Sequence, residues 1–486
     1  MKNNHLFSLI KTFDRKEMTR FKDFALSPYH NKHKDTQALI LYLHKIYPDF
    51  RPKLIKRECL WKTIFPHQTF DYSKLALLFT YTWRLVEQFL VQERQNNSSD
   101  VFNLNLLYEL RNRKQWPAYE RQWKKSEYEL NKRQKRDIEY YKYALNLAEE
   151  GNQSYIQQAR RKEDFSLIEK ERRLDQYYIL EKLRDAVEMQ VRRQILQGDY
   201  SERLLEAILQ ELKDNLDNYS DVPGIQVYYL LYQMMDQPSL SSYRKALGAF
   251  QANEAIFPIK EVAGIYIYFQ NFCISRINKN EKIFLREIFN LYKDQLERNL
   301  LHENGYLIEW HYKNIVTTAI RLEELNWVNV FIEDYKNALK VEARENAYSF
   351  NKAAYCYAIG DFDQVLNLLT QVEYHDFRYN LGAKVLLLRV YYERNEFEAL
   401  DALVESFRQY LQRNRLMADS MKSGMYSVFR ITRRIAKIKT SIKFTPPKKI
   451  MQSINKLSED LDNTQTVFNR AWLEAKIEDL KKELVA

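Results

Sequence analysis

Residues 345–373 have the sequence ENAYSFNKAAYCYAIGDFDQVLNLLTQVE, and this stretch decides the fold class. Apolar residues recur at helical spacing on both sides of Gly360-Asp361, which predicts two amphipathic helices, 345–358 and 361–373, with a tight break between them. So short a break makes the two helices antiparallel neighbours, a helical hairpin. One hairpin cannot bury its apolar face alone, so neighbouring hairpins are expected to pack against it.

The same pattern extends through the second half of the chain. Helices separated by short breaks are expected near 200–217, 224–236, 239–254, 259–277, 281–299, 304–325, 328–342, 345–358, 361–373, 377–393 and 396–413. Successive hairpins connected in this way stack into an α-solenoid.

The composition favours helices throughout the chain. Its 486 residues include 9 Gly and 10 Pro, where average usage gives roughly 34 and 24. Because turns, strand bulges and phosphate-binding loops depend on these residues, their scarcity disfavours β-sandwiches, Rossmann domains and P-loop enzymes. The 45% hydrophobic residues are sufficient for a packed core. An all-α fold is therefore predicted.

The first hundred residues predict a compact helical bundle. Its helices are expected at about 15–26, 35–47, 56–65 and 72–95. A polar break at about 95–101 marks a domain boundary. We expect four segments in the chain, namely the N-terminal helical bundle (1–97), long charged helices that start the array (98–200), the helical-hairpin solenoid (201–415), and a basic amphipathic helix followed by one C-terminal helix over 448–484 (416–486).

Aromatic residues at Trp327, Phe362 and Phe397 are 35 residues apart, and each opens the second helix of an expected hairpin. This spacing resembles the tetratricopeptide repeat (TPR) family, whose period is about 34 residues. The small-residue position of the family's first helix falls at Thr318, Ala353 and Leu388, and its downstream aromatic matches Tyr357 and Tyr391-Tyr392. The usual second-helix Ala is replaced by Val330, Val365 and Leu400. The resemblance covers about residues 311–415.

The TPR resemblance implies non-catalytic protein recognition on the concave surface formed by the first helices. Its register places the following residues on that surface: Tyr312, Ile315, Ala319, Phe350, Ala354, Tyr357, Val385, Arg389 and Tyr392. Some TPR domains hold a terminal carboxylate with a basic, Asn-rich clamp, but Ile315, Phe350 and Val385 are apolar. An extended or helical apolar peptide is therefore the expected ligand.

A basic segment lies near the end of the chain. Residues 408–449 contain twelve Lys or Arg and one acid, Asp419, for a net charge of +11. A helix is expected over Met425–Lys443, with an apolar face formed by Ile431, Ile435, Ile438 and Ile442. Beside that face lies a basic patch formed by Arg430, Arg433, Arg434 and Lys437.

Four interpretations of this helix are open. It can close the solenoid with its charges in water, bind the phosphates of DNA or RNA, bind an acidic protein, or lie on an anionic membrane surface. Nucleic-acid binding would be sequence-nonspecific, because the segment has no RNP motif or zinc finger. The chain is thus expected to be a protein–protein interaction scaffold or adaptor, and the alternative is a nucleic-acid-binding protein that uses residues 408–449.

A second basic stretch, 111–136, has a net charge of +7. Trp116, Tyr119 and Trp123 lie in it at the i, i+3 and i+7 spacing of a buried helical face. Core packing is therefore favoured over base stacking for these aromatic residues.

No motif indicates an enzyme, a metal or a cofactor. The cysteines Cys59, Cys273 and Cys356 form no CxxC pair, and the eight histidines include no HExxH. The closest histidine pair, His30 and His33, lies in basic surroundings typical of a polar loop. The cysteine pattern suits a reducing, cytoplasmic compartment.

Two uncharged runs bear on membrane insertion. Val222–Met235 and Val262–Ser275 are 14 residues long each, too short for a membrane span. Both are expected to be buried core helices.

Overall fold

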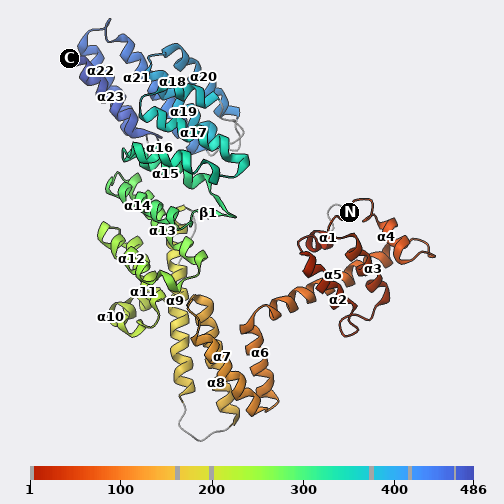
Figure 1. Ribbon diagram of the computed structural model, residues 1–486. Coiled ribbons are helices and arrows are strands. Elements are labelled where there is room, and N and C mark those ends of the chain that lie inside the picture. The colour runs from red at the N-terminus through yellow and green to blue at the C-terminus, as the bar shows by residue number, and fades with distance from the viewer. Residues whose placement is uncertain are drawn as a thin grey trace. The chain divides into compact units, whose positions relative to one another are not determined.

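The computed structural model describes residues 5–158, 165–195, 202–370, 377–413, 419–464 and 467–485. Within these ranges the fold is all-α, as predicted (Figure 1). The strands among them are β1 (His302–Glu303) and β2 (Tyr306–Leu307), which form a short antiparallel hairpin. The chain divides into two compact units, Met1–Pro258 and Ile259–Ala486.

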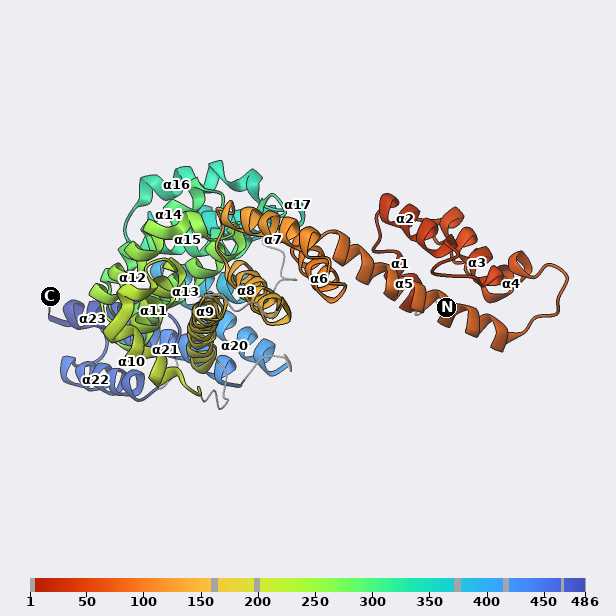
Figure 2. The same cartoon turned by 90° about the horizontal axis from the view of Figure 1, so that it is seen from below.

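The first unit begins with a helical bundle. Its helices are α1 (His5–Ile10), α2 (Arg15–Leu26), α3 (Lys34–Ile46), α4 (Arg57–Ile64) and α5 (Tyr72–Asn96). Asp14 and Glu17 form a capping box that starts α2. The helices α2 and α3 pack along α5 (Figure 2), and the buried residues of this cluster extend from Leu6 to Phe89. The helices α1 to α5 therefore share one hydrophobic core.

The rest of the first unit is a series of longer helices. They are α6 (Ser99–Asn112), α7 (Trp116–Asn131), α8 (Ile138–Gln158), α9 (Ser166–Ile195), α10 (Leu205–Asn215), α11 (Pro223–Asp236) and α12 (Leu240–Asn253), with 3-10 turns at Leu216–Tyr219 and Glu254–Ile256. The helix α6 packs on α7 and α8, α8 on α9, and α11 on both α9 and α12. Of the two uncharged runs, the first forms most of α11, eight of whose residues are buried.

The second unit consists of successive helical hairpins. Its helices are α13 (Ile259–Asn278), α14 (Ile283–Glu297), α15 (Glu309–Arg321), α16 (Leu325–Asp334), α17 (Val341–Ala358), α18 (Phe362–Thr370), α19 (Phe377–Glu393), α20 (Phe397–Arg413), α21 (Asp419–Ser441), α22 (Pro447–Asn463) and α23 (Arg470–Val485), with a 3-10 turn at Lys336–Ala338. The pairs α13–α14, α15–α16, α17–α18 and α19–α20 pack as hairpins. The first helices also pack on one another in order, α15 on α17, α17 on α19 and α19 on α21.

One backbone motif recurs at the hairpin turns. The second residue after the first helix has a positive φ, at Lys114, Asn280, Glu323, Gly360 and Asn395. At each turn the next amide donates to the carbonyl five positions earlier, as from Asp361 N to Cys356 O at 2.9 Å. This is the Schellman motif, which ends a helix and fixes where the next one begins. The last three turns are 37 and 35 residues apart.

Three expected helices differ in the structure. The helix expected over 328–342 is α16, which ends at Asp334 and is followed by the 3-10 turn Lys336–Ala338. The helix expected over 304–325 begins at Glu309, because β1 and β2 occupy the residues before it. The helix expected over 448–484 is two helices, α22 and α23. Reversal of the chain between them lets both apolar faces join the same core, through Ile454 and Leu457 of α22 and Leu473 and Ile477 of α23. A single continuous helix could not place both sets there.

Candidate functional site

A cavity of about 370 Å³ opens on the first helices of the second unit. Its walls come from α15, α17 and α19, with one residue from α21 and the two residues that precede α23. The lining residues are Lys313, Thr317, Ile320, Arg321, Phe350, Ala354, Tyr357, Gly382, Val385, Leu386, Arg389, Met425, Phe468 and Asn469.

Each helix presents one face to this cavity. The spacing is i, i+4 and i+7 in all three helices: Lys313, Thr317 and Ile320 in α15, Phe350, Ala354 and Tyr357 in α17, and Gly382, Leu386 and Arg389 in α19. Residues at this spacing share one side of a helix. The cavity is therefore a surface that three successive hairpins build in the same way.

Five of the nine residues predicted for the concave surface line this cavity: Phe350, Ala354, Tyr357, Val385 and Arg389. The other four do not. Tyr312, Ile315 and Ala319 are 0% exposed and Tyr392 is 2% exposed, so all four belong to the core and cannot contact a ligand. The prediction that these four residues lie on the surface is therefore wrong.

The length of one hairpin explains the error in α15. The residues Ile315 and Ala319 precede Phe350 and Ala354 by 35 positions, the spacing of the aromatic residues in the sequence. The turns at Glu323 and Gly360 are 37 residues apart. Subtracting 37 instead of 35 from the α17 positions gives the residues of α15 that line the cavity.

The helix α23 explains the burial of Tyr392. The ring of Trp472 packs edge-on against Tyr392, with centroids 5.7 Å apart. Trp472 Nε1 also donates to the Tyr357 hydroxyl at 3.1 Å, and that hydroxyl donates to Glu393 Oε1 at 3.0 Å. Lys476 pairs with Glu393 at 3.1 Å. The first turns of α23 thus cover the end of α19 and bound the cavity on that side.

Arg389 is held between two aromatic rings. Its guanidinium carbon lies 4.1 Å from the centroid of Tyr357 and 5.3 Å from that of Trp472. Its Nε is buried without a hydrogen-bond partner. No carboxylate in the described ranges lies within ion-pair distance of it. Stacking of this kind fixes the direction of the guanidinium group.

Two further cations line the cavity. Desolvation lowers the pKa of Arg321, and none of the described acids pairs with this side chain. The ammonium of Lys313 lies 4.7 Å from the Trp310 ring and 5.4 Å from the Phe350 ring. The lining set contains no acid, so the formal charge of its side chains is positive.

The apolar floor depends on a glycine. A Cβ added at Gly382 would lie 2.7 Å from Cζ of Phe350, so the aromatic ring packs directly on the bare backbone of α19. Glycine inside a helix costs about 1 kcal/mol relative to alanine. The close approach of Phe350 is the physical reason for a glycine at this position.

Two carboxylates pair with three of the four cations of the basic patch on α21. Arg430 pairs with Asp460 at 2.9 Å, Arg434 pairs with the same carboxylate, and Arg433 pairs with Asp401 at 2.8 Å. The hydrogen bond from Arg430, together with the charge of Arg434, lowers the pKa of Asp460. Of the four predicted patch residues, Lys437 is exposed. Both acids lie outside residues 408–449, so the charge of that segment overstates its free positive charge.

Exposed lysines gather instead at the turn between α21 and α22. Lys443, Lys448 and Lys449 are exposed there, and Phe444 beside them is 86% exposed. This turn therefore presents exposed cations, whereas three arginines of α21 are paired with acids of the protein.

The second basic stretch is also paired. Arg111 forms a bidentate pair with Glu150 at 2.6 and 3.2 Å, and Arg133 pairs with Asp100. Tyr119 is buried and its ring stacks on that of Trp123. Its hydroxyl donates to the backbone carbonyl of Glu150 at 3.2 Å. These contacts fit the predicted core face.

The histidine pair of the N-terminal bundle has local partners. His33 caps α3 by accepting a hydrogen bond from the Thr36 amide, and the His30 ring stacks on Phe24. The described residues contain no group of three His, Cys, Asp or Glu that could hold a metal ion.

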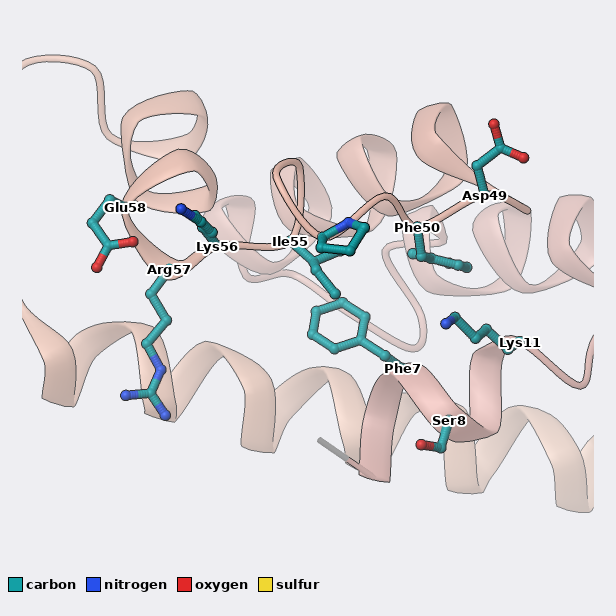
Figure 3. A pocket seen from close by; sticks show the side chains of 10 residues that line it. Phe7, Ser8, Lys11, Asp49, Phe50, Ile55, Lys56, Arg57 and Glu58 are labelled. Carbon is teal, nitrogen blue, oxygen red and sulfur yellow. The ribbon is translucent and has the colours of Figure 1, made fainter. Parts of the chain in front are cut away.

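The N-terminal bundle also has a hollow of about 750 Å³ (Figure 3). Phe7, Phe50 and Ile55 form its buried floor. The charged residues around it are of both signs: Lys11, Asp49, Lys56, Arg57 and Glu58. This mixed rim selects no particular ligand charge, in contrast to the cavity of the second unit.

Comparisons with protein-family models, with curated proteins and with solved structures gave no match. The resemblance to TPR proteins therefore stays a prediction from the sequence. None of the helices in the described part of the chain has both the length and the apolar character needed to cross a bilayer.

Proposed function

We propose that this chain is a non-catalytic scaffold or adaptor that binds a peptide or protein segment in the cavity on α15, α17 and α19. The observation that carries the proposal is the cavity itself, to which three successive hairpins each contribute one face at the same spacing. The predicted TPR resemblance favours the same surface, because TPR proteins bind ligands on their first helices.

The chemistry of the lining supports binding. The residues are apolar, aromatic, amide, hydroxyl or cationic, and none is a carboxylate, histidine or thiol. A volume of about 370 Å³ lies at the small end of ligand sites. It suits a short segment of a partner, whose remaining surface would rest outside the cavity. The three cysteines are free, and a cytoplasmic location is part of the proposal.

The test fills the cavity without disturbing the core. Ala354 lies in the middle of the floor and is half-buried, so Ala354→Trp places an indole where the ligand would lie. Ala358 lies on the same helix, is exposed and does not line the cavity, so Ala358→Trp is the matched control. The two tagged variants and the wild type are used for affinity purification from the native host at about 150 mM salt, with and without nuclease.

We expect mass spectrometry to find a defined protein partner with the wild type and with Ala358→Trp. The Ala354→Trp variant should lose it, while circular dichroism shows unchanged helix content. Capture that survives Ala354→Trp would refute the cavity as the site. Loss of the partner on nuclease treatment would favour the alternative, nucleic-acid binding near the turn between α21 and α22.

A further inference from the structure

We infer that the segment bound in the cavity carries a side-chain carboxylate, which pairs with Arg389 and Arg321 next to an apolar side chain on the Phe350 floor. This inference rests on the proposed function and specifies its ligand class as an acidic peptide. It revises the apolar peptide expected from the sequence.

The first argument is the state of Arg389. Four described arginines have a buried Nε without a partner: Arg184, Arg276, Arg344 and Arg389. The first three bond through another nitrogen, to Glu181, to Glu281 and to backbone carbonyls. Arg389 lies over two aromatic rings and reaches the Tyr357 hydroxyl, but none of the described acids pairs with it and its Nε keeps no acceptor. A buried donor without an acceptor is costly, and an acceptor supplied by a ligand would satisfy it.

The second argument is charge complementarity. Other cations of this unit, including Lys352 and Arg394, are paired with acids. Arg321 and Arg389 line one cavity and have no such partner among the described residues, and no acid lines the cavity. Guanidinium groups match a carboxylate through two parallel hydrogen bonds. A carboxylate brought by the ligand would complete this set.

The third argument is the position of the charges relative to the floor. Near the C-terminal ends of the three helices, the cavity is lined by Ile320, Tyr357 and Arg389, with Arg321 next to Ile320. Phe350 and Gly382 line it nearer the N-terminal side of their helices. The apolar floor and the guanidinium groups therefore lie at different levels of the cavity. A ligand that fills both levels must carry an apolar side chain and an acidic side chain at a fixed separation.

The test selects ligands from a defined source. A phage library of random 12-residue peptides, fused to the coat protein through their C-termini, offers side-chain carboxylates and no free terminal one. It is panned on the full-length chain and counter-selected on Ala354→Trp. We expect the enriched peptides to share one Asp or Glu at a fixed distance from an aromatic or aliphatic residue.

Fluorescein-labelled copies of these peptides are then titrated by fluorescence anisotropy. Arg389→Gln should weaken binding about 10- to 100-fold, the usual effect of losing a charged hydrogen bond. Replacing the Asp or Glu of the peptide by Asn or Gln should weaken binding by a similar factor. The altered peptide should bind Arg389→Gln only slightly more weakly than either change alone allows, because both changes remove the same ion pair. Arg389→Lys should restore only part of the affinity. Lys340→Gln removes an equal charge from an exposed position outside the cavity and should change the Kd less than twofold.

The carboxylate inference and the proposed binding function are refuted by different results. Peptides that are lost with Ala354→Trp but lack acids, or that keep their Kd within twofold in Arg389→Gln, would overturn the carboxylate inference and leave the binding function standing. If no peptide is enriched over Ala354→Trp, the proposed function is refuted and the inference with it. Displacement of the peptides by single-stranded DNA would assign the cations to nucleic acid and overturn the inference.

Discussion

The ion pair between Arg111 and Glu150 offers a quantitative test of how the first unit is held together. It joins α6 to α8 through two hydrogen bonds, and its side chains are 8% and 10% exposed. The hydrogen bond that Arg111 donates to Glu150 raises the pKa of Arg111. The pair between Arg113 and Glu109 on the same helix has side chains that are 72% and 54% exposed, so it is a matched control of the same chemistry.

The expected magnitudes follow from this difference in burial. Glu150→Leu leaves a buried guanidinium without a countercharge and should lower the free energy of unfolding by about 3–5 kcal/mol. Glu109→Ala removes an exposed pair and should cost about 0.5 kcal/mol or less. The double variant Arg111→Met, Glu150→Leu replaces both charges by apolar groups, and its cost should be small or even negative. The coupling energy between the two sites should therefore exceed about 2 kcal/mol.

Urea unfolding measures these values, and hydrogen exchange of peptides from α6–α8 assigns the transition to this part of the two-unit chain. Equal costs for Glu150→Leu and Glu109→Ala would refute the argument from burial. Additive costs in the double variant would show that the two charges do not depend on each other.

Three further predictions concern other parts of the chain. Glu323 has a φ of 59°, a backbone conformation that costs free energy in a residue with a Cβ, so Glu323→Gly should stabilise the protein by about 1 kcal/mol. Gly360 has a φ of 82°, so Gly360→Ala should destabilise the protein by about 1 kcal/mol. The same free energy of unfolding for both variants in urea would contradict this reasoning. Burial raises the pKa of Tyr42, Tyr219 and Tyr348 to about 12. Above pH about 10 the unfolded chain therefore binds fewer protons than the folded one, and stability should fall from there towards pH 12. Urea midpoints that stay constant between these pH values would contradict this prediction. Arg434→Glu should cost about 1 kcal/mol, because it leaves Asp460 next to a like charge, whereas the exposed Lys448→Glu should stay within about 0.5 kcal/mol; thermal unfolding of both variants tests the difference.

The sequence predicted the helices better than the turns. The few glycines and prolines and the helical periodicity were sufficient for the all-α class, and α2, α19 and α20 begin and end within one residue of their predicted bounds. The Schellman turns at Lys114 and Glu323 were not predicted, because Lys and Glu rarely adopt a positive φ and carry no turn signal. The reversal between α22 and α23 was missed for a related reason, since it contains no Gly or Pro.

Charge counting along the chain also had a physical limit. The excess of +11 over residues 408–449 is correct as a sum, but the acids that pair with three of its arginines are Asp401 and Asp460, outside that segment. These partners come from the preceding and following helices, α20 and α22. A hairpin brings such residues together across about 30 positions of sequence. A local charge sum therefore identifies where cations are, and only the fold shows which of them remain free.

The cavity shows how strongly the prediction of surface residues depends on the repeat period taken from the sequence. Each residue of an α-helix turns the chain by about 100°, so an error of two residues in the period rotates the assigned face by about 200°. The period of 35 drawn from Trp327, Phe362 and Phe397 was two residues short between the turns at Glu323 and Gly360. In α15 it therefore selected the buried side, which is also apolar and carries no signal to distinguish it from a binding surface. In α17, whose positions need no shift by the repeat period, all three residues predicted for the surface line the cavity. The charges follow the same rule, because the corrected register replaces Ile315 and Ala319 by Lys313 and Thr317 and adds a cation to the surface expected in α15. The ligand chemistry expected from the sequence thus depends on the length assigned to one hairpin.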